Sequence, residues 1–163
     1  MNTPALALLC ISLFGPNTPD HQPLAIKLPD RTFTLKWVHS IERSGWEETW
    51  RVTVDGFTPV NARIKTGGSG MEPPLSSDFI DGWYVYVPEV GPVLEIIIPD
   101  SDFTSPMQIC VQDDCAPMSD AAARKPNDIR PIRIWSGSGC SQIAMPPQHI
   151  RVGVGSGEEG KNL

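Results

Sequence analysis

The chain has 163 residues, which suits one domain with its own core, and its 17 prolines and 14 glycines leave few windows long enough for a helix. Its formal net charge of −6 and its pI of about 4.9 disfavour nucleic acid and anionic membrane surfaces as partners. Composition therefore argues against a largely helical protein and against a nucleic-acid-binding one, and it leaves the function open.

The first apolar segment, residues 5–14, reads ALALLCISLF. Its length matches the hydrophobic region of a signal peptide and is too short to cross a bilayer. No Lys or Arg precedes it, so a second interpretation stays open, in which the run is an uncleaved first strand. We interpret residues 1–19 as a signal or anchor segment, 20–154 as a single β domain and 155–163 as a polar tail.

Short runs of alternating polarity, rich in β-branched and aromatic residues, continue along the chain between turn residues. The runs predicted as strands are 33–41, 46–54, 60–65, 83–87, 93–98, 107–111, 129–135 and 149–154. One short helix is expected at 120–124, with Ser119 or Asp120 as its cap. We predict an all-β fold, a single antiparallel β-sandwich or barrel-like domain of about eight strands with at most one short helix.

Residues 37–50, WVHSIERSGWEETW, combine tryptophans with a histidine and glutamates. A hairpin turn at Ser44-Gly45 pairs position 41 with 48, 39 with 50 and 37 with 52. Because side chains alternate between the two faces of a strand, one face becomes apolar except for His39 and Glu48. That face holds Leu35, Trp37, His39, Ile41, Trp46, Glu48, Trp50, Val52 and Val54.

In this register His39 and Glu48 are diagonal neighbours, about 7–8 Å apart at the backbone. An unpaired carboxylate among tryptophans is costly to bury, so we predict a half-buried His39–Glu48 pair, with His39 also in contact with Trp50. A structural bridge and a polar binding site both stay open as roles for this pair. Ser40 points to the opposite face from His39, so the two do not form a nucleophile and its base.

Other segments offer weaker signals for a binding site. Residues 66–70, TGGSG, can act either as an anion-binding nest near Arg63 and Lys65 or as a plain flexible turn. No Gly-Lys-Ser/Thr follows, so this is not a phosphate-binding P-loop. The loop aspartates lack EF-hand spacing, and the cysteines lack a CxxC motif or a histidine cluster. We therefore expect no metal and no cofactor.

The four cysteines are Cys10, Cys110, Cys115 and Cys140. We predict that Cys110 or Cys115 pairs with Cys140, which leaves the other thiol free or paired with Cys10. The alternative is a local Cys110–Cys115 bridge, which closes a shorter loop and constrains the unfolded chain less. Disulfide staples of either kind are typical of a loop-rich extracytoplasmic domain.

Residues 35–50, together with the downstream segment 67–74 that reads GGSGMEPP, resemble an uncharacterised bacterial family, family 1850 among the domains of unknown function. The shared pattern is a strand ending in His39-Ser40, then an acidic and aromatic strand with a key glutamate at Glu48, then a Gly-rich turn ending in Gly70-Met71. The three later cysteines also resemble the family pattern. The turn departs mildly from it, since Gly-Ser-Gly stands where a Gly-Ala-Gly type is expected.

Members of this family tend to be encoded beside TAXI-type tripartite ATP-independent periplasmic transporters, which carry organic acids across the inner membrane with a soluble binding protein. The resemblance implies a periplasmic or otherwise extracytoplasmic accessory or binding protein, whose partner is the transporter or its solute-binding protein. Membrane contact is expected only through an N-terminal anchor. The residues expected to bind are Trp37, His39, Ser40, Glu48, Trp50, Gly70, Met71 and Glu72.

Two alternatives to the binding protein stay open. The first is a small enzyme that uses His39 and Glu48 as acid and base in a tryptophan-lined pocket. The second is a purely structural domain.

Overall fold

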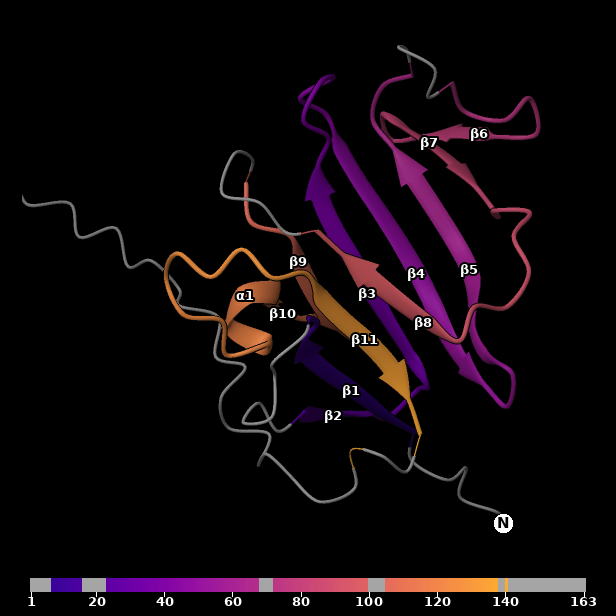
Figure 1. Cartoon of the computed structure of the whole chain (residues 1–163). Helices are drawn as coiled ribbons and strands as arrows, with labels where there is room; N and C mark the ends of the chain where they lie inside the picture. Colours follow the sequence, from indigo (N-terminus) through magenta and orange to yellow (C-terminus); the bar gives the residue numbers. More distant parts are fainter. Residues whose placement is uncertain (1–6, 16–22, 68–71, 100–104, 138–139, 141–163) are drawn as a thin grey trace, which may run out of the picture.

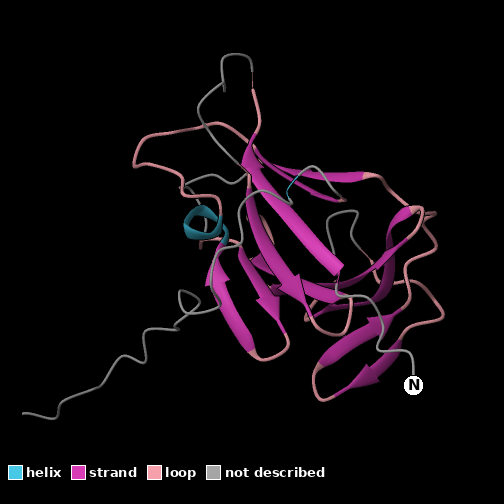
Figure 2. Cartoon of the chain, turned by 90° about the horizontal axis from the view of Figure 1, so that it is seen from below, coloured by secondary structure: helices cyan, strands magenta, loops and turns pink. Residues whose placement is uncertain are grey.

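The computed structural model describes residues 7–15, 23–67, 72–99, 105–137 and 140, so the strand predicted at 149–154 lies outside the described residues. The described residues form two antiparallel sheets and one short helix (Figure 1). Strands dominate the chain, and the helix lies at one side of them (Figure 2). The predicted all-β fold with a single short helix is confirmed.

The smaller sheet has four strands in the order β2-β1-β11-β8. They are β1 (Ala7–Leu13), β2 (Leu24–Leu28), β8 (Glu95–Ile98) and β11 (Ile132–Ser136). β1 lies between β2 and β11, and its Leu9 and Ile11 are fully buried. Residues 7–13 of the apolar run thus form an interior strand in the described chain, and whether the run also serves as a signal or anchor stays a prediction. A domain that began at residue 20 would lack this strand.

The larger sheet has seven strands in the order β10-β9-β3-β4-β5-β7-β6. They are β3 (Thr32–Val38), β4 (Gly45–Thr53), β5 (Gly56–Ile64), β6 (Asp78–Ile80), β7 (Trp83–Tyr86), β9 (Gln108–Val111) and β10 (Asp114–Pro117). Each predicted run within the described ranges contains a strand. Strands β2, β6 and β10 have no predicted counterpart.

The helix α1 (Met118–Ala121) begins before the predicted start. Its N-cap is Pro117, and no side chain caps it, so the prediction of Ser119 or Asp120 as cap is wrong. Met118 is fully buried. Burial of this side chain and the hydrogen bond from its amide to the carbonyl of Met107, at 2.7 Å, hold the turn in place without a side-chain cap.

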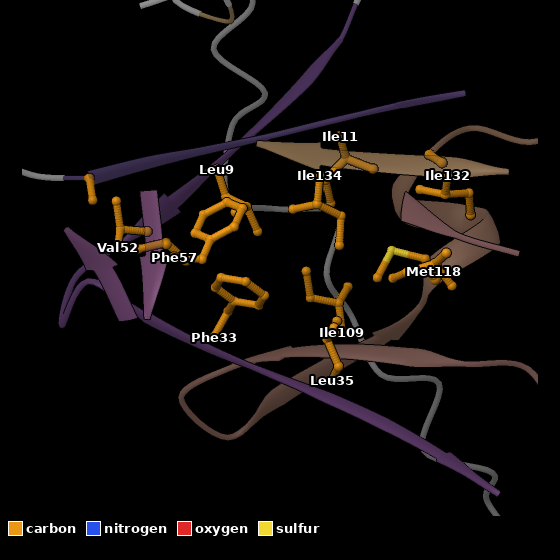
Figure 3. Packing of buried hydrophobic residues seen from close by; sticks show 14 of the residues in the cluster. Leu9, Ile11, Phe33, Leu35, Val52, Phe57, Ile109, Met118, Ile132 and Ile134 are labelled. Carbon is orange, nitrogen blue, oxygen red and sulfur yellow. The ribbon is translucent and has the colours of Figure 1, made fainter. Parts of the chain in front are cut away.

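The core lies between the two sheets (Figure 3). Phe33 and Phe57 meet edge to face, with ring centroids 5.3 Å apart. Burial of each such side chain contributes about 1.5–3 kcal/mol to the free energy of unfolding. The fully or nearly fully buried core residues labelled in Figure 3 are Leu9, Ile11, Ile132 and Ile134 from the small sheet, Phe33, Leu35, Val52, Phe57 and Ile109 from the large sheet, and Met118 from α1.

The hairpin end of β3 and β4 extends beyond the strands of the small sheet (Figure 1). Burial follows this geometry, since Phe33 and Leu35 are buried whereas Trp37 and Trp46, nearer the hairpin end, are only partly buried. The inner face of the large sheet is therefore apolar and closed at one end, and aromatic and partly exposed at the other.

Candidate functional site

The connection between β3 and β4 is longer than the predicted two-residue turn. It consists of residues 39–44. The amide of His39 donates to the carbonyl of Ser44 at 2.9 Å, and the amide of Arg43 donates to the carbonyl of His39 at 2.9 Å. Arg43 has a φ of 50°. These contacts close the hairpin over six residues, where the sequence had suggested a tip at Ser44-Gly45.

The longer connection changes the pairing of the two strands. Trp37 lies opposite Trp46, and Leu35 lies opposite Glu48. The rings of Trp37 and Trp46 stack with centroids 5.5 Å apart. The predicted register, with position 37 opposite 52, is therefore wrong. The displacement is an even number of residues, so each strand side chain keeps its predicted face.

His39 and Glu48 do not form the predicted pair. His39 lies four residues beyond Leu35, the partner of Glu48, which is about 13 Å along a strand. Its ring lies 6.1 Å from that of Trp46, and its Nδ1 accepts a hydrogen bond from the amide of Glu42 at 3.4 Å. The acid–base pair required by the enzyme alternative is therefore not formed.

Glu48 lies on the inner face of the large sheet between two indole N–H groups. Nε1 of Trp46 donates to Oε1 of Glu48 at 3.3 Å, and Nε1 of Trp50 donates to Oε2 at 3.2 Å. The tryptophans stand two residues before and after Glu48, so strand alternation places all three on one face. Burial raises the pKa of Glu48 above its ordinary value of 4.5, and the two hydrogen bonds lower it in part.

Tyr86 extends this site across the sheet. Glu48 lies opposite Ala62, and Ala62 lies opposite Tyr86. Burial and the negative charge of Glu48 raise the pKa of the Tyr86 phenol above its ordinary value of 10.0, so the phenol stays neutral at physiological pH. We define the Glu48 site as the five partly buried residues Trp37, Trp46, Glu48, Trp50 and Tyr86.

The other residues predicted to bind do not join this site. Ser40 is exposed in the connection after β3, and Glu72 is exposed in the segment that follows β5. Gly70 and Met71 lie outside the described residues. The structure thus brings together Trp37, Glu48 and Trp50.

A polar pocket that the sequence did not predict lies on the opposite face of the large sheet. Its volume is about 300 Å³. Lys36 lies opposite Glu47, and Glu47 lies opposite Arg63, which sets a row of charges across three strands. The residues that line this polar pocket are Thr34, Lys36, Glu47, Thr49, Asn61, Arg63, Val85, Cys110 and Gln112.

Glu47 is the centre of the charged row. Oε2 of Glu47 is 2.7 Å from Nη2 of Arg63 and 2.9 Å from its Nε. Nζ of Lys36 is 3.8 Å from Oε1. The guanidinium of Arg63 also lies 4.6 Å from the centroid of the Trp83 ring. The row therefore carries one more positive than negative charge in a chain whose net charge is −6.

A sequence signal for this pocket existed in part. Strand alternation in the hairpin puts Lys36, Glu47 and Thr49 on the face opposite the tryptophans. Arg63 and Asn61 join them only through the pairing of β4 with β5. That pairing joins two strands whose relative register no residue pattern had predicted.

The cysteines form two disulfides, Cys10–Cys140 and Cys110–Cys115. The predicted bond from Cys110 or Cys115 to Cys140 is wrong, and the local alternative is confirmed. Cys110 and Cys115 lie directly opposite each other on β9 and β10, with Cα atoms 4.0 Å apart. Cys140 instead reaches Cys10 in the small sheet, where both side chains are buried.

The described residues contain neither a metal-binding cluster nor a membrane-spanning helix. Among the described residues, no group of three or more His, Cys, Asp or Glu side chains is placed to hold a metal ion. Within the same ranges, no helix has the length and apolar composition that crossing a bilayer requires. The absence of a metal from the whole protein stays a prediction.

A family model matches the part of the chain that contains both surfaces. The model describes a domain of unknown function, DUF1850, and it matches residues 33–118. The chain belongs to the DUF1850 family. The match runs from β3 to the start of α1, so it includes the polar pocket and the Glu48 site but not β1, β2 or β11. Neither a curated protein nor a solved structure matches the chain.

Proposed function

We propose that this DUF1850 domain is an extracytoplasmic, periplasmic binding protein that holds a small organic anion in the polar pocket and acts with a TAXI-type transporter of organic acids. The observation that carries the proposal is the charged row of Lys36, Glu47 and Arg63 in that pocket. The row gives a surplus of positive charge at one place on an otherwise acidic protein.

The chemistry of Arg63 suits a carboxylate ligand. A guanidinium carries five N–H donors in a fixed plane, and it recognises carboxylates in a bidentate manner. Two nitrogens of Arg63 contact Glu47, and this contact holds the guanidinium in one orientation. The donors of Arg63 outnumber its bonds to Glu47, so the side chain can bind a ligand without losing its partner.

The rest of the pocket suits a small polar molecule. The hydroxyls of Thr34 and Thr49 are 2.9 Å apart and share one hydrogen bond. Asn61 and Gln112 add amide groups to the lining. A volume of about 300 Å³ lies at the lower end of the range for small-molecule sites. These features favour an acid with further hydroxyl or carboxyl groups over an apolar ligand.

Two observations support the cellular setting. The four cysteines form two disulfides, and such bonds persist in oxidising compartments such as the periplasm. Membership of the DUF1850 family supports the transporter link through the resemblance described above. The transporter or its solute-binding protein is the partner we propose.

Isothermal titration calorimetry with mono- and dicarboxylic acids tests the binding proposal. We expect Arg63→Gln to weaken binding of the best acid by about tenfold or more, because a charge-assisted hydrogen bond is lost. Arg51→Gln is the matched control. Arg51 is exposed on β4, on the same outer face of the large sheet as Arg63, and it does not line the pocket. Equal affinities for the two variants, or no binding by any acid, would contradict the proposal.

Uptake by cells tests the transporter link separately. Cells that carry Arg63→Gln should take up the bound acid more slowly than cells that carry Arg51→Gln. If uptake is unchanged although the purified Arg63→Gln protein has lost affinity for the acid, the binding proposal stands but the link to transport is refuted.

A further inference from the structure

Glu48 carries a negative charge that no cation of the described residues neutralises. Its two carboxylate oxygens each accept one indole N–H, from Trp46 and from Trp50. The neighbouring carboxylate of Glu47, by contrast, faces the other side of β4 and contacts both Arg63 and Lys36. A partly buried carboxylate without a cationic partner keeps an unneutralised charge, which a bound cation would stabilise.

Further aromatic residues lie on the same face of the sheet as this carboxylate. Trp37 stacks on Trp46, Trp50 stands on the other side of Glu48 along β4, and Tyr86 lies two strands away on the same face. The negative faces of aromatic rings attract cations, most strongly those that are weakly hydrated. Carboxylate and rings together form a surface that complements a positive charge.

The hydrogen bonds at Glu48 narrow the choice of cation. Each oxygen already accepts one N–H, which occupies about half of the four acceptor positions of the carboxylate, and aromatic side chains make up the rest of the Glu48 site. A metal ion needs several polar ligands, and among the described residues no group of three or more His, Cys, Asp or Glu side chains is placed to hold one. A quaternary ammonium has no N–H groups, so it needs no hydrogen-bond acceptors from the site.

We propose that the Glu48 site binds the quaternary ammonium group of a small organic cation. The site is on the inner face of the large sheet and runs from Trp50, which packs against the core, toward the hairpin end at Trp37 and Trp46. The polar pocket is on the outer face. All five residues of the site are partly exposed. The net charge of −6 also favours the approach of a cation.

Choline chloride and its neutral analogue 3,3-dimethyl-1-butanol are the probes that test this proposal on the whole chain. The two molecules have nearly the same shape and differ in charge. We expect choline to shift the indole N–H signals of Trp46 and Trp50 in NMR spectra. The affinity for the neutral alcohol should be lower by about tenfold or more. Equal affinities, or unshifted indole signals across the millimolar range of choline, would overturn the proposal.

Substitutions test whether choline binds at Glu48. Glu48→Gln should reduce choline affinity by about tenfold, and Glu89→Gln, an exposed carboxylate in the loop after β7, should leave it unchanged. Wild-type affinity should also fall as the pH drops through the pKa of Glu48, which keeps a test available if Glu48→Gln does not fold. Choline binding that persists in folded Glu48→Gln, or that is independent of pH in that range, contradicts the assignment. Arg63→Gln should not change choline binding, so this proposal and the anion proposal fail independently.

Discussion

Two adjacent glutamates on β4 meet opposite environments. Glu47 faces outward between Lys36 and Arg63, and Glu48 faces inward between Trp46 and Trp50. Strand alternation alone separates them. The charge of Glu47 is balanced, while the charge of Glu48 is held by neutral N–H donors, and this contrast underlies our proposal of two different ligand chemistries.

The raised pKa of Glu48 predicts a pH-dependent effect of Glu48→Gln. Between the unfolded and the folded pKa the folded protein binds more protons, so this residue makes the protein more stable as pH falls through that window. The glutamine variant lacks this titration. The stability of the variant relative to wild type should therefore be higher at neutral pH than near 4.5, the ordinary pKa. Urea denaturation at the two pH values measures it, and a difference that is constant or reversed contradicts the environment described for Glu48.

Gly56 is a position where only glycine fits. Its φ is 112°, and an added Cβ would lie 2.3 Å from the carbonyl oxygen of Val93. We expect Gly56→Ala to destabilise the protein by at least about 2 kcal/mol. Gly91→Ala is the control, because nothing lies within 4 Å of its Cβ position. Similar thermal unfolding of the two variants would argue against the contact between Gly56 and Val93.

At the scale of elements, the β3–β4 hairpin shows what the sequence could predict. Alternation placed Trp37, Trp46 and Glu48 on one face correctly, because that property survives an even change of register. Connection length was not predictable from Ser44-Gly45, which also suits a tight turn. Stacking of Trp37 on Trp46 belongs to the longer connection, and no local pattern encodes such a cross-strand contact.

Substitution of Arg43 distinguishes the two hairpins. In the six-residue connection Arg43 has a φ of 50°, which costs a non-glycine residue about 1–2 kcal/mol. Arg43→Gly should therefore leave stability unchanged or raise it by up to about 1 kcal/mol. Arg51→Gly, within β4, should lower stability by a similar amount. Loss of stability in both variants would favour the two-residue turn, in which position 43 belongs to a strand.

At the scale of the whole molecule, fold class was predictable and strand partners were not. Short alternating runs between prolines and glycines allow little except a β-sandwich or barrel. The strands that were missed are short or lack alternation, such as β6 (Asp78–Ile80), in which every residue is exposed. β1 was ambiguous because an apolar strand at the interior of a sheet resembles the hydrophobic region of a signal peptide. The polar pocket was missed because its residues meet only through the order of the strands.

The two disulfides should contribute unequally to the stability of the folded chain. The Cys10–Cys140 bond has a sequence separation of 130 and the Cys110–Cys115 bond one of 5. Loop-closure entropy gives about 5 kcal/mol for the first and about 2 kcal/mol for the second. Replacing each pair by alanines and measuring guanidinium unfolding checks the order. A smaller loss for the Cys10–Cys140 variant, or a different pairing in a mass map of the unreduced protein, contradicts it.

NMR mapping of a titration with succinate tests the proposal that the outer face of the large sheet binds an organic anion. If the anion binds there, the backbone signals of Thr34, Thr49 and Asn61 and the guanidinium signal of Arg63 shift together with one dissociation constant. The indole signals of Trp46 and Trp50, on the inner face, should stay in place. Shifts confined to the inner face, or no saturable shift at these four outer-face residues with any organic acid tried, would contradict the claim.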